Sequence, residues 1–209
     1  MSSKPLYLAS QSPRRKELLE QLGLKFKIFI PQKAELIAPK KIKQKNPAQI
    51  VREIALHKAL AAHEEILLQK KKRGVIVAAD TLVFLQKKVL GKPKNRGEAL
   101  KMLQKLSGKT HIVATAVSIL YFNGNKMKQK TIVVKSRVSF YKLSRQTLHW
   151  YLRTPEPYDK AGAYGAQSLG AVFIEKFSGS YTNVVGLPLS QTIKLLENVT
   201  GEKWQTWQK

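Results

Sequence analysis

The distribution of apolar residues along the chain changes repeatedly between the periods of strands and helices. The short apolar run from Leu6 to Ala9 predicts a strand. Ser12 and Pro13 then supply a helix N-cap and a first-turn proline, and leucines at helical spacing follow until Gly23 ends the helix. The chain therefore opens with a strand, a tight turn and a helix.

The next segments continue this alternation. Phe26 to Ile30 alternates as a strand does, and the polar, lysine-rich stretch from Pro31 to Pro47 predicts a loop. A second helix is expected from Pro47 past Ala62. Its inward-facing stripe consists of Val51, Ile54, Ala55, Ala59 and Ala62.

Val75 to Ala79 is a continuous apolar run, typical of a central strand buried on both faces, and we expect this strand to end at Asp80 and Thr81. Later segments predict a helix at Arg96–Leu106 and a hairpin of His111–Phe122 with Thr131–Leu143. They also predict a helix at Ser144–Leu152, a strand at Ala171–Phe177 and a last helix from Pro188. The alternation indicates an α/β fold with a mixed sheet. No repeat or flexible linker divides the sequence, so we expect one domain over residues 1–209.

Composition narrows the setting in which the protein works. The chain has 209 residues, 43% of them hydrophobic, and neither a secretory signal nor a membrane-spanning apolar stretch is evident, so we expect a cytoplasmic protein. The absence of cysteine excludes disulfides and thiolate metal sites. A metal would therefore have oxygen or imidazole ligands, which favours a hard cation such as Mg²⁺.

The formal net charge of +25 makes nucleic-acid binding an alternative to be weighed. The lysines are spread along the chain, however, and no basic run is interleaved with aromatic residues. We therefore do not expect a dedicated nucleic-acid site. A basic surface still attracts smaller polyanions such as nucleotides.

The first candidate site is the turn between the first strand and the first helix. Ser10, Arg14 and Arg15 gather there around free N–H groups at the helix N-terminus, an arrangement that suits phosphate. Ligands also bind at the carboxyl ends of strands in α/β sheets. The alternative is that Ser12 is only an N-cap and both arginines are solvated.

Three further charged residues stand out. Asp80 follows five apolar residues, and a carboxylate in such a place suits metal binding or general-base catalysis, although capping a turn is the alternative. Lys58 shares the inward face of its helix, where it either reaches solvent or binds an anion in a cleft. Glu35 is the one acid between Leu24 and Lys45.

Two loops complete the candidate set. Lys92 stands between Gly91 and Pro93, and Gln167 ends a segment rich in small residues that begins at Asp159. Gln167 has the donor and acceptor needed at the edge of a base. A plain turn and a close-packed loop are the alternatives. Neither segment matches a P-loop or a dinucleotide fingerprint, so the residues indicate a phosphate-binding α/β protein of another kind.

Several motifs together resemble the Maf family of septum-formation inhibitors. They are Leu8-Ala-Ser-Gln-Ser-Pro-Arg-Arg15, Ala79-Asp-Thr81, Gly91-Lys-Pro93, Leu106-Ser-Gly-Lys-Thr-His111, Glu156-Pro-Tyr-Asp-Lys-Ala-Gly-Ala-Tyr164, Gly179-Ser-Tyr181 and Val185-Gly-Leu-Pro188. The resemblance implies an elongated α/β fold with helices flanking a central sheet and two lobes around a nucleotide-binding cleft, commonly in a homodimer. It also implies a nucleoside triphosphate pyrophosphatase that uses Mg²⁺, Mn²⁺ or a similar divalent ion.

Matched position by position, the resemblance assigns roles to the candidate residues. Asp80 is expected to accept the proton from water and, with Glu35, to bind the metal. The phosphates are expected to contact Ser10, Arg14, Arg15, Lys58 and Lys92. Substrate choice is associated with Arg14, Thr81 and Gln167, and the surrounding segments resemble the branch that hydrolyses dTTP and UTP. An enzyme for 7-methyl-GTP or damaged purine nucleotides, and a non-enzymatic nucleic-acid or division-protein binder, are the alternatives.

The chain departs from the family pattern at two positions. Ala34 stands where an acid usually precedes the position of Glu35, a change that would weaken metal binding. Ser168 stands where glycine usually follows Gln167, a change that would narrow the pocket for the base.

Overall fold

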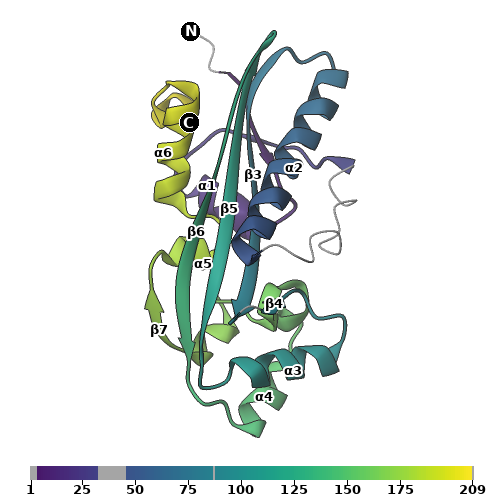
Figure 1. The fold of residues 1–209 in the computed structure, drawn as a ribbon, viewed down its shortest axis with the longest axis vertical. Coiled ribbons are helices and arrows are strands. Elements are labelled where there is room, and N and C mark those ends of the chain that lie inside the picture. Colours follow the sequence, from purple (N-terminus) through teal and green to yellow (C-terminus); the bar gives the residue numbers. More distant parts are fainter. Residues whose placement is uncertain (1–3, 33–45, 87, 209) are drawn as a thin grey trace.

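The computed structural model describes residues 4–32, 46–86 and 88–208 (Figure 1). The strands of its seven-stranded sheet are β1 (Leu6–Ala9), β2 (Lys27–Ile28), β3 (Arg73–Leu85), β4 (Lys88–Leu90), β5 (Thr110–Asn123), β6 (Lys126–Phe140) and β7 (Ile174–Ser178). The α-helices in these ranges are α1 (Pro13–Glu20), α2 (Pro47–Leu68), α3 (Arg96–Leu106), α4 (Arg145–Tyr151), α5 (Tyr181–Val185) and α6 (Leu189–Thr200). Short 3-10 helices are η3 (Glu156–Asp159), η4 (Ala161–Ala163), η5 (Leu169–Phe173) and η6 (Trp204–Trp207).

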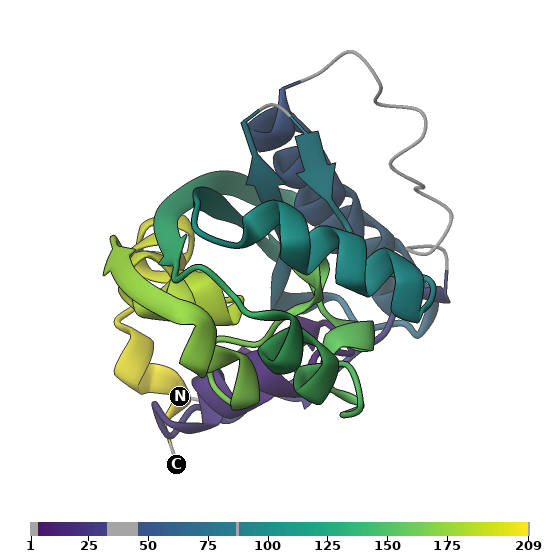
Figure 2. The same cartoon turned by 90° about the horizontal axis from the view of Figure 1, so that it is seen from below.

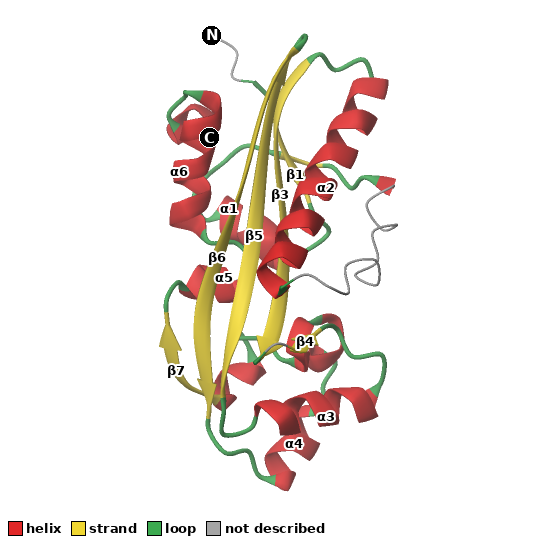
Figure 3. Cartoon of the chain, viewed as in Figure 1, coloured by secondary structure: helices red, strands yellow, loops and turns green. Residues whose placement is uncertain are grey.

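The sheet is mixed, as the sequence predicts. Its order is β2-β1-β3-β5-β6-β7, with β4 paired to the far end of β3. The strand β1 is parallel to β2 and β3, and the remaining pairs are antiparallel. The β5–β6 hairpin runs along the long axis of the molecule (Figure 3), and it turns at Gly124, whose φ of +56° glycine adopts without steric cost. The expected hairpin is confirmed, with its second strand starting earlier than predicted.

Helices cover both faces of the upper part of the sheet (Figure 1). Alternate side chains of β3 face opposite sides, so Ile76 and Ala78 pack beneath α2 whereas Val75 and Val77 join the core under α1 and α6. The helix α2 was predicted from its apolar stripe, and that stripe is buried against β3 and β5. In the described ranges, no helix combines the length and the apolar character needed to cross a membrane.

A second lobe forms around the opposite end of the long strands, seen end-on in Figure 2. Here α3, α4 and the glycine-rich segment from Tyr158 to Gly170 pack on β3, β5 and β6. Their shared core includes Leu103, Phe140, Tyr151 and Phe173. Edge-to-face contacts link these rings, for example Tyr151 with Phe173 at 4.7 Å between centroids. The expected α/β fold with two lobes is therefore confirmed.

The strand β3 differs from its prediction in a way that matters for function. It does not end at Asp80 but continues to Leu85, because β5 goes on pairing with it through Thr81 and beyond. Its parallel neighbour β1 does stop, at Ala9 opposite Ala78. Asp80 therefore lies in the middle of a strand, just where one edge of that strand becomes free.

Two other strand predictions were partly wrong. The strand expected over Phe26 to Ile30 pairs with β1 only at Lys27 and Ile28. The strand expected from Ala171 begins at Ile174, because Leu169 to Phe173 turns as a 3-10 helix before reaching the edge of β6.

Candidate active site

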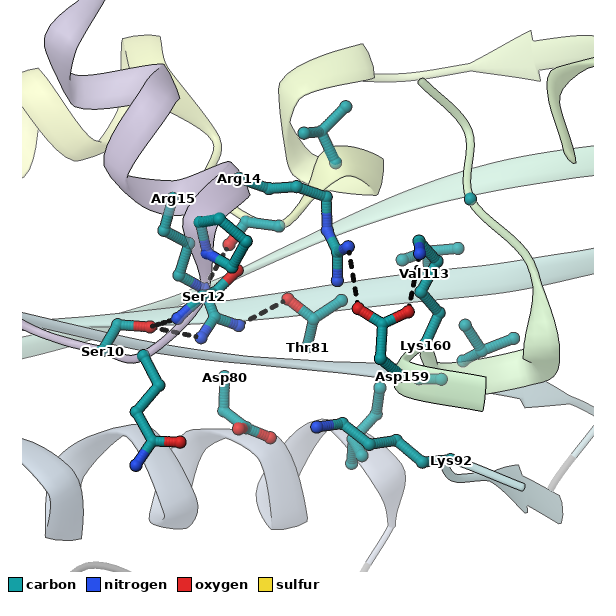
Figure 4. A pocket seen from close by; sticks show the side chains of 18 of the residues that line it. Ser10, Ser12, Arg14, Arg15, Asp80, Thr81, Lys92, Val113, Asp159 and Lys160 are labelled. Atoms are coloured by element: carbon teal, nitrogen blue, oxygen red, sulfur yellow. Dashed lines mark hydrogen bonds and ion pairs between the residues drawn. The ribbon is translucent and has the colours of Figure 1, made fainter. Parts of the chain in front are cut away.

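A cavity of about 650 Å³ lies between the two lobes, beside the free edge of β3 (Figure 4). This size falls within the range of pockets for small molecules. All the predicted site residues that the structure describes line it: Ser10, Arg14, Arg15, Lys58, Asp80, Thr81, Lys92 and Gln167. Glu35 and its neighbour Ala34 lie outside the described residues.

The end of β1 opens this cavity. Among the described strands, β1 pairs with this edge of β3 up to Ala78 and β4 from Val83 onward, so the edge is free between these two residues. Successive side chains there reach the same space from opposite faces of the sheet. Asp80 lies on the α2 face and Thr81 on the α1 face. The cavity thus lies beyond the carboxyl end of a parallel strand, where α/β sheets commonly bind ligands.

Asp80 forms an ion pair with Lys58. The distance from Lys58 Nζ to Asp80 Oδ1 is 2.5 Å, and the side chains are 26% and 17% exposed, respectively. Lys58 keeps helical register with Ala55 and Ala62, both fully buried, so α2 presents this ammonium group to the sheet. Asp80 Oδ2 has no hydrogen-bond donor among the described residues and remains available to a ligand.

Arg15 is buried, with 9% of its surface exposed, and is held by three hydrogen bonds. It donates from Nε to the carbonyl of Gly186 at 2.9 Å, and from its two terminal nitrogens to Ser10 Oγ and Thr81 Oγ1, each at 3.1 Å. A guanidinium has five N–H groups, and the two that remain have no acceptor in the part of the chain that the structure describes, so they can bind a ligand in the cavity. Burial lowers the pKa of Arg15, while the charge of Asp80 opposes that shift.

The N-terminus of α1 supplies further donors. Ser12 is the N-cap residue, as predicted, but its side chain makes no capping hydrogen bond. Instead Ser10 Oγ accepts from the Ser12 N–H at 3.2 Å. The backbone N–H groups of Arg14 and Arg15 have no acceptor within the described chain. They form the positive end of the helix dipole, which favours binding of an anion.

An acid on the opposite wall was missed as a site residue in the sequence. Asp159 Oδ2 lies 3.5 Å from Arg14 and Oδ1 lies 2.6 Å from Lys160 (Figure 4). Burial alone would raise the pKa of Asp159, but the hydrogen bond and charge of Lys160, together with Arg14, lower it. The pair with Arg14 links α1 to η3 across the cavity. The one feature of the sequence that could have indicated Asp159 is the presence of an acid beside a glycine-rich segment in a strongly basic chain.

The glycine-rich segment is folded back on itself. The Glu156 carboxylate accepts from the N–H groups of Leu169 and Gly170, and from the Tyr151 hydroxyl. A Cβ on Gly170 would lie 2.6 Å from the carbonyl oxygen of Gly165, so glycine is required for one part of this loop to pack on another.

Lys92 and Gln167 lie at the rim. Both side chains are exposed, and the Gly91 carbonyl accepts from Gly162 at 3.0 Å, which joins the lysine turn to the glycine-rich segment. Ser168, the second departure from the family pattern, is exposed and is not among the residues that line the cavity.

Sequence comparisons identify proteins that are similar to this chain. The family model described as Maf-like protein matches residues 5–199. A protein named dTTP/UTP pyrophosphatase from Thermosipho melanesiensis is 42% identical over 191 residues, which cover 91% of this chain and 96% of the relative. Proteins of the same name from Caldanaerobacter subterraneus and Bacillus cereus are 38% and 40% identical, covering 98% and 93% of this chain and 93% and 89% of their own. The chain therefore belongs to the Maf-like protein family.

Proposed function

We propose that this protein is a nucleoside triphosphate pyrophosphatase that hydrolyses dTTP and UTP to the monophosphate and pyrophosphate. Three relatives at about 40% identity bear the name dTTP/UTP pyrophosphatase and match nearly the whole chain. The observation that carries the proposal is the placement of one carboxylate, Asp80, among cationic groups that line the same cavity.

The cationic groups suit a triphosphate. Arg15 offers a fixed guanidinium with free N–H groups, and the adjacent start of α1 adds backbone donors. Lys92 and Lys160 contribute charge from the other lobe. We infer that these groups hold the phosphate chain and stabilise the charge that builds up on pyrophosphate as it leaves.

Asp80 is the group best placed to activate water. One of its oxygens is bound to Lys58 and the other has no hydrogen-bond partner among the described residues, so the carboxylate is both oriented and able to accept a proton. Water attacks the α-phosphorus, its oxygen stays on the monophosphate, and the bond to the bridging oxygen breaks so that pyrophosphate leaves. One proton of the water passes to the Asp80 carboxylate, and the other stays with the products.

The donor set also fits a divalent cation delivered with the substrate. In the described ranges no three His, Asp or Glu side chains cluster as a metal site. Mg²⁺ commonly binds one or two protein carboxylates together with substrate phosphates, and Asp80 provides one carboxylate with a free oxygen. When bound, Mg²⁺ or Mn²⁺ would neutralise phosphate charge, with Asp80 and Glu35 as the proposed ligands.

Base recognition is assigned to the rim of the cavity. Gln167 has an amide that complements the donor and acceptor edge of uracil or thymine, and it lies at the exposed end of the cavity. Arg14 lies across the opening, paired with Asp159.

The homodimer and the single domain stay predictions, as does the cytoplasmic location expected from the composition.

A panel of triphosphates tests the proposal. Pyrophosphate release is measured with dTTP, UTP, 7-methyl-GTP and the purine triphosphates, each with Mg²⁺ and with Mn²⁺. We expect the highest kcat/KM for dTTP and UTP. A higher kcat/KM for 7-methyl-GTP would contradict the substrate assignment, and salt-dependent binding of duplex DNA without hydrolysis of any triphosphate would contradict the enzyme assignment.

A further inference from the structure

A continuous chain of hydrogen bonds lies behind Arg15. The guanidinium donates to Thr81 Oγ1 at 3.1 Å, Thr81 Oγ1 lies 2.9 Å from Thr115 Oγ1, and Thr115 Oγ1 donates to the Asn183 carbonyl at 2.8 Å. Thr115 and Asn183 are fully buried. This chain of hydrogen bonds therefore runs from the cavity into the protein interior, and its far end has no contact with solvent.

The direction of every bond in this chain follows from counting protons. A hydroxyl group has one proton, and a carbonyl oxygen only accepts. The Thr115 proton is directed to Asn183, so Thr81 must donate its own proton to Thr115. Thr81 then accepts from Arg15 and has no proton left. Thr81 consequently has no proton with which to donate a hydrogen bond to a bound nucleotide.

The far end of the chain is rigidly held. Asn183 Oδ1 accepts from the Thr115 N–H at 3.1 Å, and its amide nitrogen donates to the Val113 carbonyl and to Ser136 Oγ at 3.0 and 2.9 Å. Ser136 in turn donates to the Ser180 carbonyl at 2.9 Å. Both ends of the Asn183 amide are thus bonded, which fixes its orientation and locks α5 onto β5.

The same helix also holds Arg15 from the other side. Gly186 ends α5, and its carbonyl accepts from Arg15 Nε at 2.9 Å. Asn183 and Gly186 therefore fix two separate nitrogens of one guanidinium, the first through the two threonines and the second directly. The closed ring of contacts leaves Arg15 little freedom to rotate.

We propose that Thr115 and Asn183 are positioning residues for substrate phosphate, and that Thr81 acts through Arg15 and not by donating a hydrogen bond to the base. This inference rests on the proposed function, because it takes phosphate as the ligand of Arg15. Orientation of a buried arginine fork improves phosphate binding since less freedom is lost on binding.

Binding of inorganic tripolyphosphate, measured by calorimetry, tests the role of Thr115. Thr115→Val has nearly the same shape but lacks the hydroxyl, and we expect its Kd to rise about fivefold to tenfold, the scale of one lost hydrogen bond. The matched control Thr115→Ser keeps the hydroxyl and should stay within about twofold of the wild-type Kd. Equal weakening by Thr115→Ser would contradict the proposal.

A double-mutant cycle separates positioning from a general loss of structure. In an Arg15→Lys background the hydrogen-bond chain has lost its end, so Thr115→Val should weaken tripolyphosphate binding by less than about twofold further. The same factor in both backgrounds would overturn the proposal. Should Thr115→Val fold poorly, the cycle is repeated with Thr81→Val, a substitution at a partly exposed position that breaks the same chain.

The Thr81→Val variant also separates action through Arg15 from contact with the base. We expect equal factors of weakening for dTTP, UTP and tripolyphosphate, because the last of these has no base. Weakening confined to the nucleotides would overturn the proposal, as would wild-type protein that fails to bind tripolyphosphate. If the protein binds tripolyphosphate with the expected coupling but hydrolyses no nucleotide, the proposed function alone fails.

Discussion

Lys58 Nζ lies 2.5 Å from Asp80 Oδ1, so a helix on one face of the sheet delivers a cation to the carboxylate in the middle of its central strand. The contact explains why a lysine occupies the inward face of α2. It also means that the carboxylate is oriented before a nucleotide arrives. Triphosphate in the cavity would compete with Asp80 for this ammonium group.

Lys58→Met should lower kcat/KM for dTTP by about tenfold or more, because it removes both a phosphate ligand and the partner that orients Asp80. The melting temperature should fall modestly, since Asp80 is left without its cation in a partly buried place. The double variant Lys58→Met/Asp80→Asn should recover the melting temperature but not the activity. Normal kinetics in Lys58→Met would leave the lysine with a structural role only.

Asp159→Asn should lower KM for dTTP about twofold to fivefold, because the variant frees Arg14 from its ion pair and removes a negative charge from the cavity. Steady-state kinetics at several salt concentrations check this, with the gain shrinking as salt screens the charges. Glu175→Gln, which removes an exposed acid of β7 that does not line the cavity, serves as a charge-matched control. A rise in KM would show that Asp159 orients Arg14 for substrate.

His111 should make stability depend on pH. It is 1% exposed, and burial lowers its pKa from the ordinary 6.5 to about 4. The unfolded chain therefore takes up this proton first, and stability falls as pH drops from about 6.5 toward 4, by about 3 kcal/mol. Above pH 7 the contribution is constant.

His111→Phe removes this titration while keeping an aromatic ring against Phe140. Urea unfolding of both proteins between pH 4 and 8 gives the comparison, and the variant should show a flatter dependence below pH 6.5. The variant also leaves the Tyr164 hydroxyl without its partner, so its stability at pH 8 should be lower than that of the wild type. Parallel curves for the two proteins would contradict the assignment.

Gln167→Ala should lower kcat/KM for dTTP and UTP by about 1 kcal/mol, the lower end of the range for a hydrogen bond because the side chain is exposed. Hydrolysis or binding of inorganic tripolyphosphate should change much less. Equal losses with and without a base would assign Gln167 to the phosphates or to the conformation of its loop.

Much of the fold was predictable because the strongest patterns are local. The helix α3 and the hairpin of β5 and β6 were expected from periodicity and a turn at Gly124, and both are present. The continuation of β3 past Asp80 was not predictable in this way. It depends on β5, a strand whose paired residues lie about 30 positions away in the sequence.

The candidate site was predictable for residues with a chemical signature. Asp80 directly follows an apolar run and Arg15 lies near the start of a helix. A charged side chain in either place suggests a functional role. Thr115 and Asn183 carry no such signal in the sequence. A threonine within a strand is ordinary, and Thr115 joins the hydrogen-bond chain only because α5 packs against β5 and brings Asn183 to it. Asp159 was missed for the same reason, since its pairing with Arg14 joins segments 145 positions apart.

The most direct measurement of the central claim is product analysis of dTTP hydrolysis by phosphorus NMR, comparing wild type with Asp80→Asn. The wild-type protein should convert dTTP to dTMP and pyrophosphate in equal amounts. Asp80→Asn should fold normally and give the same products about a hundredfold more slowly, the scale expected for loss of a general base. Release of dTDP and phosphate by the wild type, or near-normal turnover in Asp80→Asn, would contradict the account.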